Sequence, residues 1–173
     1  MSIVSLIFVG CIAAYTATAA VLDVRLHRIP NYLTVPAALL GFAYHTLAPE
    51  GWGWFASLAG LGVGLALLVV PWLLGGGGAG DVKLLAALGA WLGPQLMLIS
   101  FAISAVLAGA MVLAVLTWAI ATQGFSKVHT KHLQRDPDQD RAAHRRRRLM
   151  PFAVPVALST WMVLAWLVTF GNI

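Results

Sequence analysis

The chain alternates between long apolar runs and short segments that hold most of its charged, glycine and proline residues. Most runs approach the roughly 20 residues that an α-helix needs to cross a bilayer core. The pattern predicts an all-α fold, a polytopic membrane protein with a six-helix transmembrane bundle. The expected helices cover Ile3–Leu22, Tyr32–Leu47, about Phe55–Leu74, the residues from Val82 to Gly93, about Met97–Thr122, and Pro151–Phe170.

Two prolines mark breaks in this pattern. Pro30 disfavours helical geometry at Ile29, so the first helix should end before it, and Asn31 is expected to cap the second helix. Gly93-Pro94 interrupts the fourth run early, after about 18 Å of helix against a bilayer core of about 30 Å. The fourth helix is therefore predicted to be short or kinked.

Composition agrees with a membrane protein. Hydrophobic residues make up 60% of the 173 residues and charged residues 10%, and the mean hydropathy is +0.86. These values exclude a soluble domain. The single cysteine, Cys11, lies in the first apolar run, so the sequence offers neither a disulfide framework nor a Cys-x-x-Cys zinc site. We expect residues 1–173 to form one integral membrane domain.

The basic residues predict the orientation in the membrane. All 11 Lys and Arg fall at Arg25, Arg28, Lys83 and positions 127–148, which six crossings place on one side. By the positive-inside rule this side is cytoplasmic. We expect a multi-pass protein of the inner (cytoplasmic) membrane, with both termini outside and a basic cytoplasmic loop at about 123–149. The loop is expected to bind anionic membrane lipids, and nucleic-acid binding is not expected.

Asp23 and Asp81 are the candidate catalytic residues, because both border apolar runs and both fall at the cytoplasmic side in this topology. Carboxylates near the membrane are costly, and two that share a proton can activate water for peptide hydrolysis. Asp81 begins a helix, where the dipole favours negative charge, and Asp23 ends one. We therefore expect Asp81 as base and Asp23 as acid. The alternative is that Asp23 borders the headgroups and Asp81 caps a helix.

Glycines precede Asp81, four consecutively at 75–78 and another at Gly80. Glycine carries a high entropic cost and suits backbone that bends tightly or lies close to another chain. Gly78 and Gly80 are therefore candidate loop residues beside a peptide substrate. A plain flexible linker is the alternative reading of the run.

Three further residues are candidates for substrate contact. Lys83 follows Asp81 by two and lies on another helical face, from which it reaches substrate or lipid phosphates. Pro155, in the first turns of the last helix, leaves the carbonyl of Pro151 without a helical partner, so this carbonyl can accept from substrate or water. A helix-start proline followed by a tolerated kink is the alternative. The histidines form no metal-binding motif, so no metal or other cofactor is expected.

Three motifs resemble a known family in sequence order. Gly78-Ala79-Gly80-Asp81 followed by Val82-Lys83 looks like the Gly-x-Gly-Asp signature of intramembrane-type aspartyl proteases, in the form used by prepilin peptidases. Asp23 with the following Ile29-Pro30-Asn31 resembles that family's first aspartate. Pro151-Phe152-Ala153-Val154-Pro155 resembles its Pro-Phe-x-x-Pro opening of the last helix, with an alanine where glycine is common. The resemblance spans essentially the whole chain.

The resemblance implies an aspartyl prepilin peptidase with Asp23 and Asp81 as the catalytic pair. The substrate would be a prepilin or pilin-like precursor, whose short basic leader is cut on the cytoplasmic side, typically after a glycine. Larger members carry a cysteine-bearing zinc insert and also N-methylate the new terminus. This chain lacks such cysteines. It looks like the minimal, peptidase-only form of tight-adherence pilus systems, and N-methyltransferase activity is not expected.

Two other functions remain open from the residues alone. A small transport protein can also carry two aspartates that bind a cation or relay protons. Its ionisable groups would be expected at midplane depth and on both sides, whereas here they gather at one border. A structural subunit of a secretion apparatus, with aspartates that only cap helices, is the other alternative. The sequence does not indicate an oligomeric state.

Overall fold

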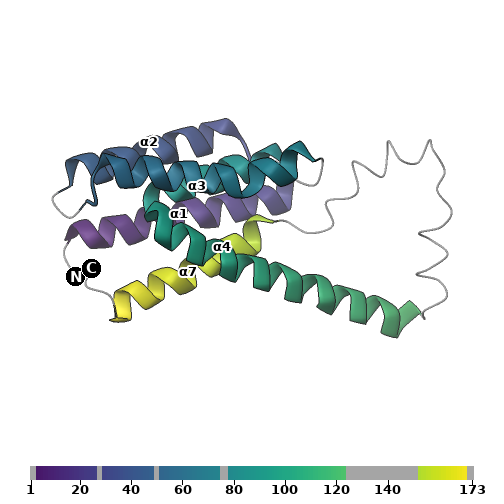
Figure 1. Ribbon diagram of the computed structural model, residues 1–173. Coiled ribbons are helices and arrows are strands. Elements are labelled where there is room, and N and C mark those ends of the chain that lie inside the picture. The colour runs from purple at the N-terminus through teal and green to yellow at the C-terminus, as the bar shows by residue number, and fades with distance from the viewer. Residues whose placement is uncertain (1–2, 27–28, 49–50, 75–77, 124–151, 171–173) are drawn as a thin grey trace.

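The computed structural model describes residues 3–26, 29–48, 51–74, 78–123 and 152–170 (Figure 1). All regular structure in these ranges is helical. The helices are α1 (Ile3–Leu26), α2 (Asn31–Leu47), α3 (Trp54–Leu73), α4 (Ala79–Gln123) and α7 (Ala153–Phe170). Among the described residues, four helices, α1, α3, α4 and α7, are long and apolar enough to cross a membrane. The protein is therefore an all-α integral membrane protein, as the sequence predicts.

The predicted count of six helices is not confirmed, since the described ranges form five. The difference arises at Gly93, where the predicted fourth and fifth helices are joined within α4. Gly93 alone leaves helical geometry, with φ 70° and ψ 175°, and the helix resumes at Pro94. The predicted interruption is thus present, and the chain changes direction there (Figure 1).

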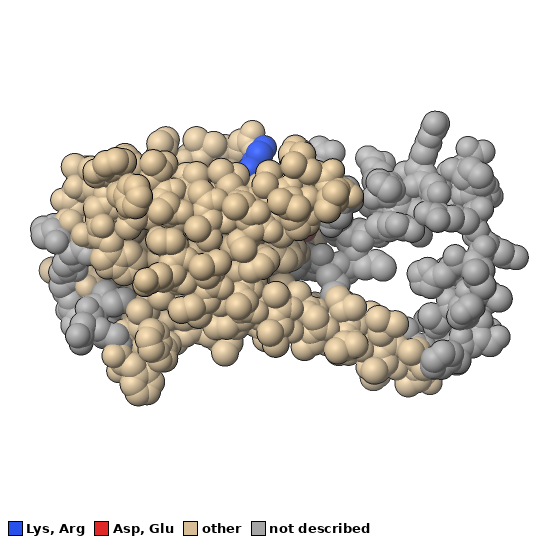
Figure 2. Space-filling view, in the orientation of Figure 1, with Lys and Arg blue, Asp and Glu red and all other residues tan. Residues whose placement is uncertain are grey.

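The first part of α4 is the centre of the bundle. Every residue from Leu84 to Gly93 is buried, although these residues occupy all sides of the helix. Helix α4 packs against α2, α3 and α7, and α7 also packs against α1. Beyond Ser104 most described side chains of α4 are exposed, and the visible face of the molecule is almost uncharged outside the grey residues (Figure 2). Such a surface suits contact with lipid.

Helices α3 and α4 approach each other at glycines. A Cβ atom on Gly60 would overlap the carbonyl oxygen of Gly89, and one on Gly89 would overlap the carbonyl oxygen of Gly60. Gly64, one turn further along α3, lies equally close to the carbonyl of Leu85. Small residues four apart allow this backbone contact between membrane helices. The close contact fixes α3 along the first part of α4, the part that begins beside Asp81.

At the break near Gly93, side chains of other helices donate hydrogen bonds to two backbone carbonyls of α4. Pro94 has no N–H for the carbonyl of Ala90, which instead accepts a hydrogen bond from Ser57 Oγ of α3 at 2.8 Å. The next carbonyl, of Trp91, accepts from His45 Nε2 of α2 at 2.7 Å. The break therefore satisfies its buried polar groups through neighbouring helices, as buried carbonyls require.

His45 uses both of its ring nitrogens. The backbone N–H of Trp52 donates to Nδ1 at 3.3 Å, so Nε2 carries the proton that it donates to the carbonyl of Trp91. The Trp52 ring stacks on the imidazole, with centroids 5.2 Å apart. His45 thereby joins α2, the segment before α3, and α4 at the end of the bundle where α4 breaks.

Replacing His45 with phenylalanine should lower the free energy of unfolding by about 1–3 kcal/mol, because an aromatic ring remains but the buried carbonyl of Trp91 and the partly buried N–H of Trp52 lose their partner. Thermal unfolding in detergent measures this loss. Thr46→Val is the matched control, since Thr46 is exposed and its hydroxyl bonds only within its own helix. Equal melting temperatures for H45F and T46V would show that the His45 contacts contribute nothing.

Candidate active site

Asp23 lies near the carboxyl end of α1 and is almost completely buried, with 2% of its surface exposed. Its Oδ2 accepts a hydrogen bond of 3.1 Å from the backbone N–H of Ala153, the first residue of α7. The first N–H groups of a helix have no partner within that helix. Asp23 therefore caps the start of α7, although Ala153 lies 130 positions away along the chain.

Asp81 lies in the first turn of α4 and is partly buried. Its Oδ2 accepts from the N–H of Gly78 at 3.2 Å, and its own N–H donates to the Gly78 carbonyl at 3.0 Å. This reciprocal pair resembles one half of a capping box. The alternative reading of Asp81 as a helix cap is thus correct in part, although it acts from the third helical position rather than from the N-cap.

The carboxyl end of α1, which carries Asp23, and the start of α4, which carries Asp81, lie at the same end of the bundle, and the two helices touch (Figure 1). The Tyr15 hydroxyl of α1 donates to the carbonyl of Leu84 at 3.2 Å. Tyr15 precedes Asp23 by about two turns, and Leu84 follows Asp81 by about one turn. Helix α1 therefore contacts α4 about one turn after Asp81.

The glycine-rich segment is described only from Gly78 onward. Gly78 is buried and supplies the N–H that holds Asp81. A Cβ atom on Gly80 would meet Ile29 at 3.4 Å, an ordinary contact. Space alone therefore does not demand glycine at position 80. Residues 75–77 lie outside the described residues, so the predicted role of the run remains a prediction.

Lys83 is exposed, and its Nζ donates to Asn31 Oδ1 of α2 at 2.8 Å. The prediction that Asn31 caps α2 is wrong, because Pro30 occupies the cap with extended backbone angles and Asn31 is already helical. Asn31 instead joins α2 to the first turns of α4. Lys83 is two residues from Asp81 in the sequence. Its predicted role in substrate contact remains a prediction.

The last motif is described in part. Pro151 lies outside the described residues, and with it the carbonyl expected to accept from substrate or water. Pro155 is buried in the first turn of α7, which begins at Ala153. Sequence reasoning missed Ala153 as a partner of Asp23, since its contribution is a backbone N–H and has no side-chain signature. The available signal was Asp23, because a carboxyl group buried beside an apolar run needs a hydrogen-bond donor.

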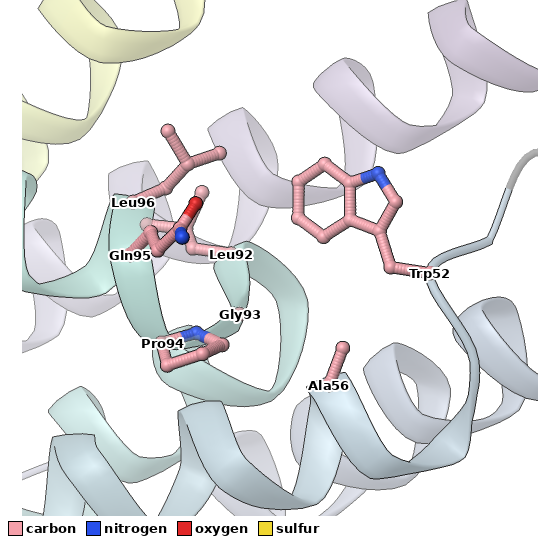
Figure 3. A pocket seen from close by; sticks show the side chains of 7 residues that line it. All are labelled: Trp52, Ala56, Leu92, Gly93, Pro94, Gln95 and Leu96. Carbon is pink, nitrogen blue, oxygen red and sulfur yellow. The ribbon is translucent and has the colours of Figure 1, made fainter.

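A pocket of about 310 Å³ lies at the other end of the bundle. It surrounds the break in α4, with Trp52 opposite Leu92, Gln95 and Leu96 (Figure 3). Neither aspartate lines it. The pocket is therefore separate from the candidate active site.

Residues 7–113 match the type IV leader peptidase family, a range that includes Asp23 and Asp81. A "Prepilin leader peptidase/N-methyltransferase" of Burkholderia pseudomallei (strain 1026b) is 40% identical over 124 residues, which cover 63% of this chain and 37% of the relative. One of the same name from Dickeya chrysanthemi is 32% identical over 133 residues, 72% of this chain and 42% of the relative. No solved structure matches. The chain belongs to the type IV leader peptidase family.

Proposed function

We propose that the protein is an aspartyl endopeptidase that removes the basic leader of prepilin or pilin-like precursors. The observation that carries this proposal is the placement of Asp23 and Asp81 on touching helices at one end of an apolar bundle. Two carboxylates are sufficient for water-mediated hydrolysis of a peptide bond. The names of the relatives include leader peptidase, and the chain spans about two fifths of their length.

Hydrolysis needs one carboxylate and one carboxylic acid. The carboxylate takes a proton from water as its oxygen attacks the scissile carbonyl carbon, and the acid donates a proton to the carbonyl oxygen. When the C–N bond breaks, the leaving amine takes a proton from the dyad. We assign Asp81 as the base, because it lies at the amino end of α4, and Asp23 as the acid.

We place this end of the bundle at the cytoplasmic face of the inner membrane. Arg25, in the last turn of α1, and Lys83, in the first turns of α4, lie at the same end as the aspartates. The positive-inside rule favours the cytoplasm for this end. If α2 crosses the membrane, and each part of α4 on either side of Gly93 crosses it too, the chain crosses six times, and both termini lie outside.

The partners follow from the same reasoning. The precursor is the substrate, and the arginines at positions 145–148, which lie outside the described residues, are proposed to bind anionic lipids. N-methyltransferase activity is included in the names of the relatives. Our proposal for this chain covers peptide hydrolysis alone.

Reconstitution tests the proposal. Purified protein in liposomes should convert a prepilin precursor into mature pilin and a free leader, detected by mass spectrometry of both products. We expect a single cut, at the boundary between the leader and the mature pilin. An intact precursor, together with ion flux across the same liposomes, would instead favour a transport protein.

A further inference from the structure

The start of α7 forms a third part of the candidate active site, beside the two aspartates. The N–H of Ala153 reaches Asp23 Oδ2 at 3.1 Å, and both residues are buried, with 1% and 2% of their surfaces exposed. A carboxyl group with a fixed donor on one oxygen keeps a fixed side-chain orientation. The position of α7 therefore affects the orientation of the carboxyl group of Asp23.

Polar contacts further along α7 hold the helix in place. Trp161 Nε1 donates to Thr16 Oγ1 of α1 at 3.0 Å. Ser100 Oγ of α4 lies 3.3 Å from Ser159 Oγ and 3.2 Å from Thr160 Oγ1. Hydrogen bonds between membrane helices each add little stability, so these contacts specify position more than they add stability. They fix α7 against the two helices that carry the aspartates.

We infer that the backbone N–H of Ala153 is a positioning group for catalysis, which orients the carboxyl group of Asp23 for proton transfer. This inference rests on the proposed function. Asp81 has an equivalent donor in the N–H of Gly78, at 3.2 Å. That donor is three residues away, whereas the donor for Asp23 requires α7 to dock on α1. The orientation of Asp23 thus depends on the tertiary structure.

Ala153→Pro tests the inference, because proline removes the N–H and is well tolerated at the first position of a helix. Ala153→Ser keeps the N–H and is the matched control. With wild-type protein cleaving the precursor, A153P should lower kcat by about tenfold to hundredfold with KM unchanged, the size expected from a misplaced catalytic group. A153S should stay within about twofold of wild type. A153P with wild-type kcat would overturn the inference.

Two results separate this inference from its alternatives. Wild-type protein that does not cleave the precursor refutes the proposed function, whereas an active wild type with an equally active A153P refutes only the positioning role. If A153P fails to fold, amide hydrogen exchange decides. The Ala153 N–H has no partner within α7, so its protection should persist in D23N and disappear in D23L. An Ala153 amide that exchanges equally fast in wild type and D23L would overturn the inference.

Discussion

Precursor cleavage should fall by on the order of 10³-fold or more when either Asp23 or Asp81 is replaced by asparagine, the scale of a lost acid–base group. Asparagine keeps the size of the side chain and an oxygen that accepts hydrogen bonds, so D23N retains its acceptor for the N–H of Ala153. It cannot take up or release the shared proton. The loss should therefore appear in turnover while membrane insertion and melting temperature remain near those of wild type.

The measurement is cleavage of a precursor by purified variants in liposomes, with Glu50→Gln as the control. Glu50 is a carboxylate remote from the basic residues in the predicted topology, and its loss should leave the rate unchanged. Wild-type rates in both single mutants would refute the dyad. Loss in only one of them would require a different partner for that aspartate.

Gly60→Leu should prevent the protein from reaching its folded state. The Cβ of the new side chain would overlap the backbone of Gly89, and a backbone oxygen cannot rotate away as a side chain does. Separating α3 from α4 would open the packing around the first part of α4, where every residue from Leu84 to Gly93 is buried. We expect a loss above about 4 kcal/mol, a large part of the 5–15 kcal/mol of a typical fold.

Gly62→Leu provides the matched control. Gly62 is on the same helix, is exposed, and has no atom within 4 Å of the position that a Cβ would take. Size-exclusion chromatography in detergent should show a monodisperse peak for G62L and aggregate for G60L. A monodisperse G60L with the melting temperature of wild type would contradict the close packing of α3 and α4.

The sequence predicts much of this fold because apolar runs of membrane length leave few alternatives to helices. The break at Gly93 was predictable from Gly-Pro, and the aspartates at one end of the bundle follow from the order of the runs. The count of five helices in the described residues was not predictable. The two parts of α4 on either side of Gly93 are separated by only one non-helical residue. The N-cap by Pro30 in place of Asn31 was also missed, because the side chain of Asn31 bonds to another helix.

The interhelical hydrogen bonds could not be predicted from the sequence. The carbonyls of Ala90 and Trp91 accept hydrogen bonds from Ser57 and His45 of two other helices, and no local sequence pattern reveals such a pairing. The same holds for Ala153, whose N–H is indistinguishable from any other in sequence. Whether Asp23 and Asp81 act as a catalytic pair remains a prediction until the variants are measured.

The hydrogen bonds to the carbonyls of Ala90 and Trp91 have a mechanical consequence. An unsupported glycine break acts as a hinge, but here bending would expose two buried oxygens and separate them from Ser57 and His45. The corner therefore behaves as a rigid joint that couples α2, α3 and both parts of α4. If the proposed function is correct, we expect the movement that admits a substrate at the aspartate end of the bundle rather than at this corner.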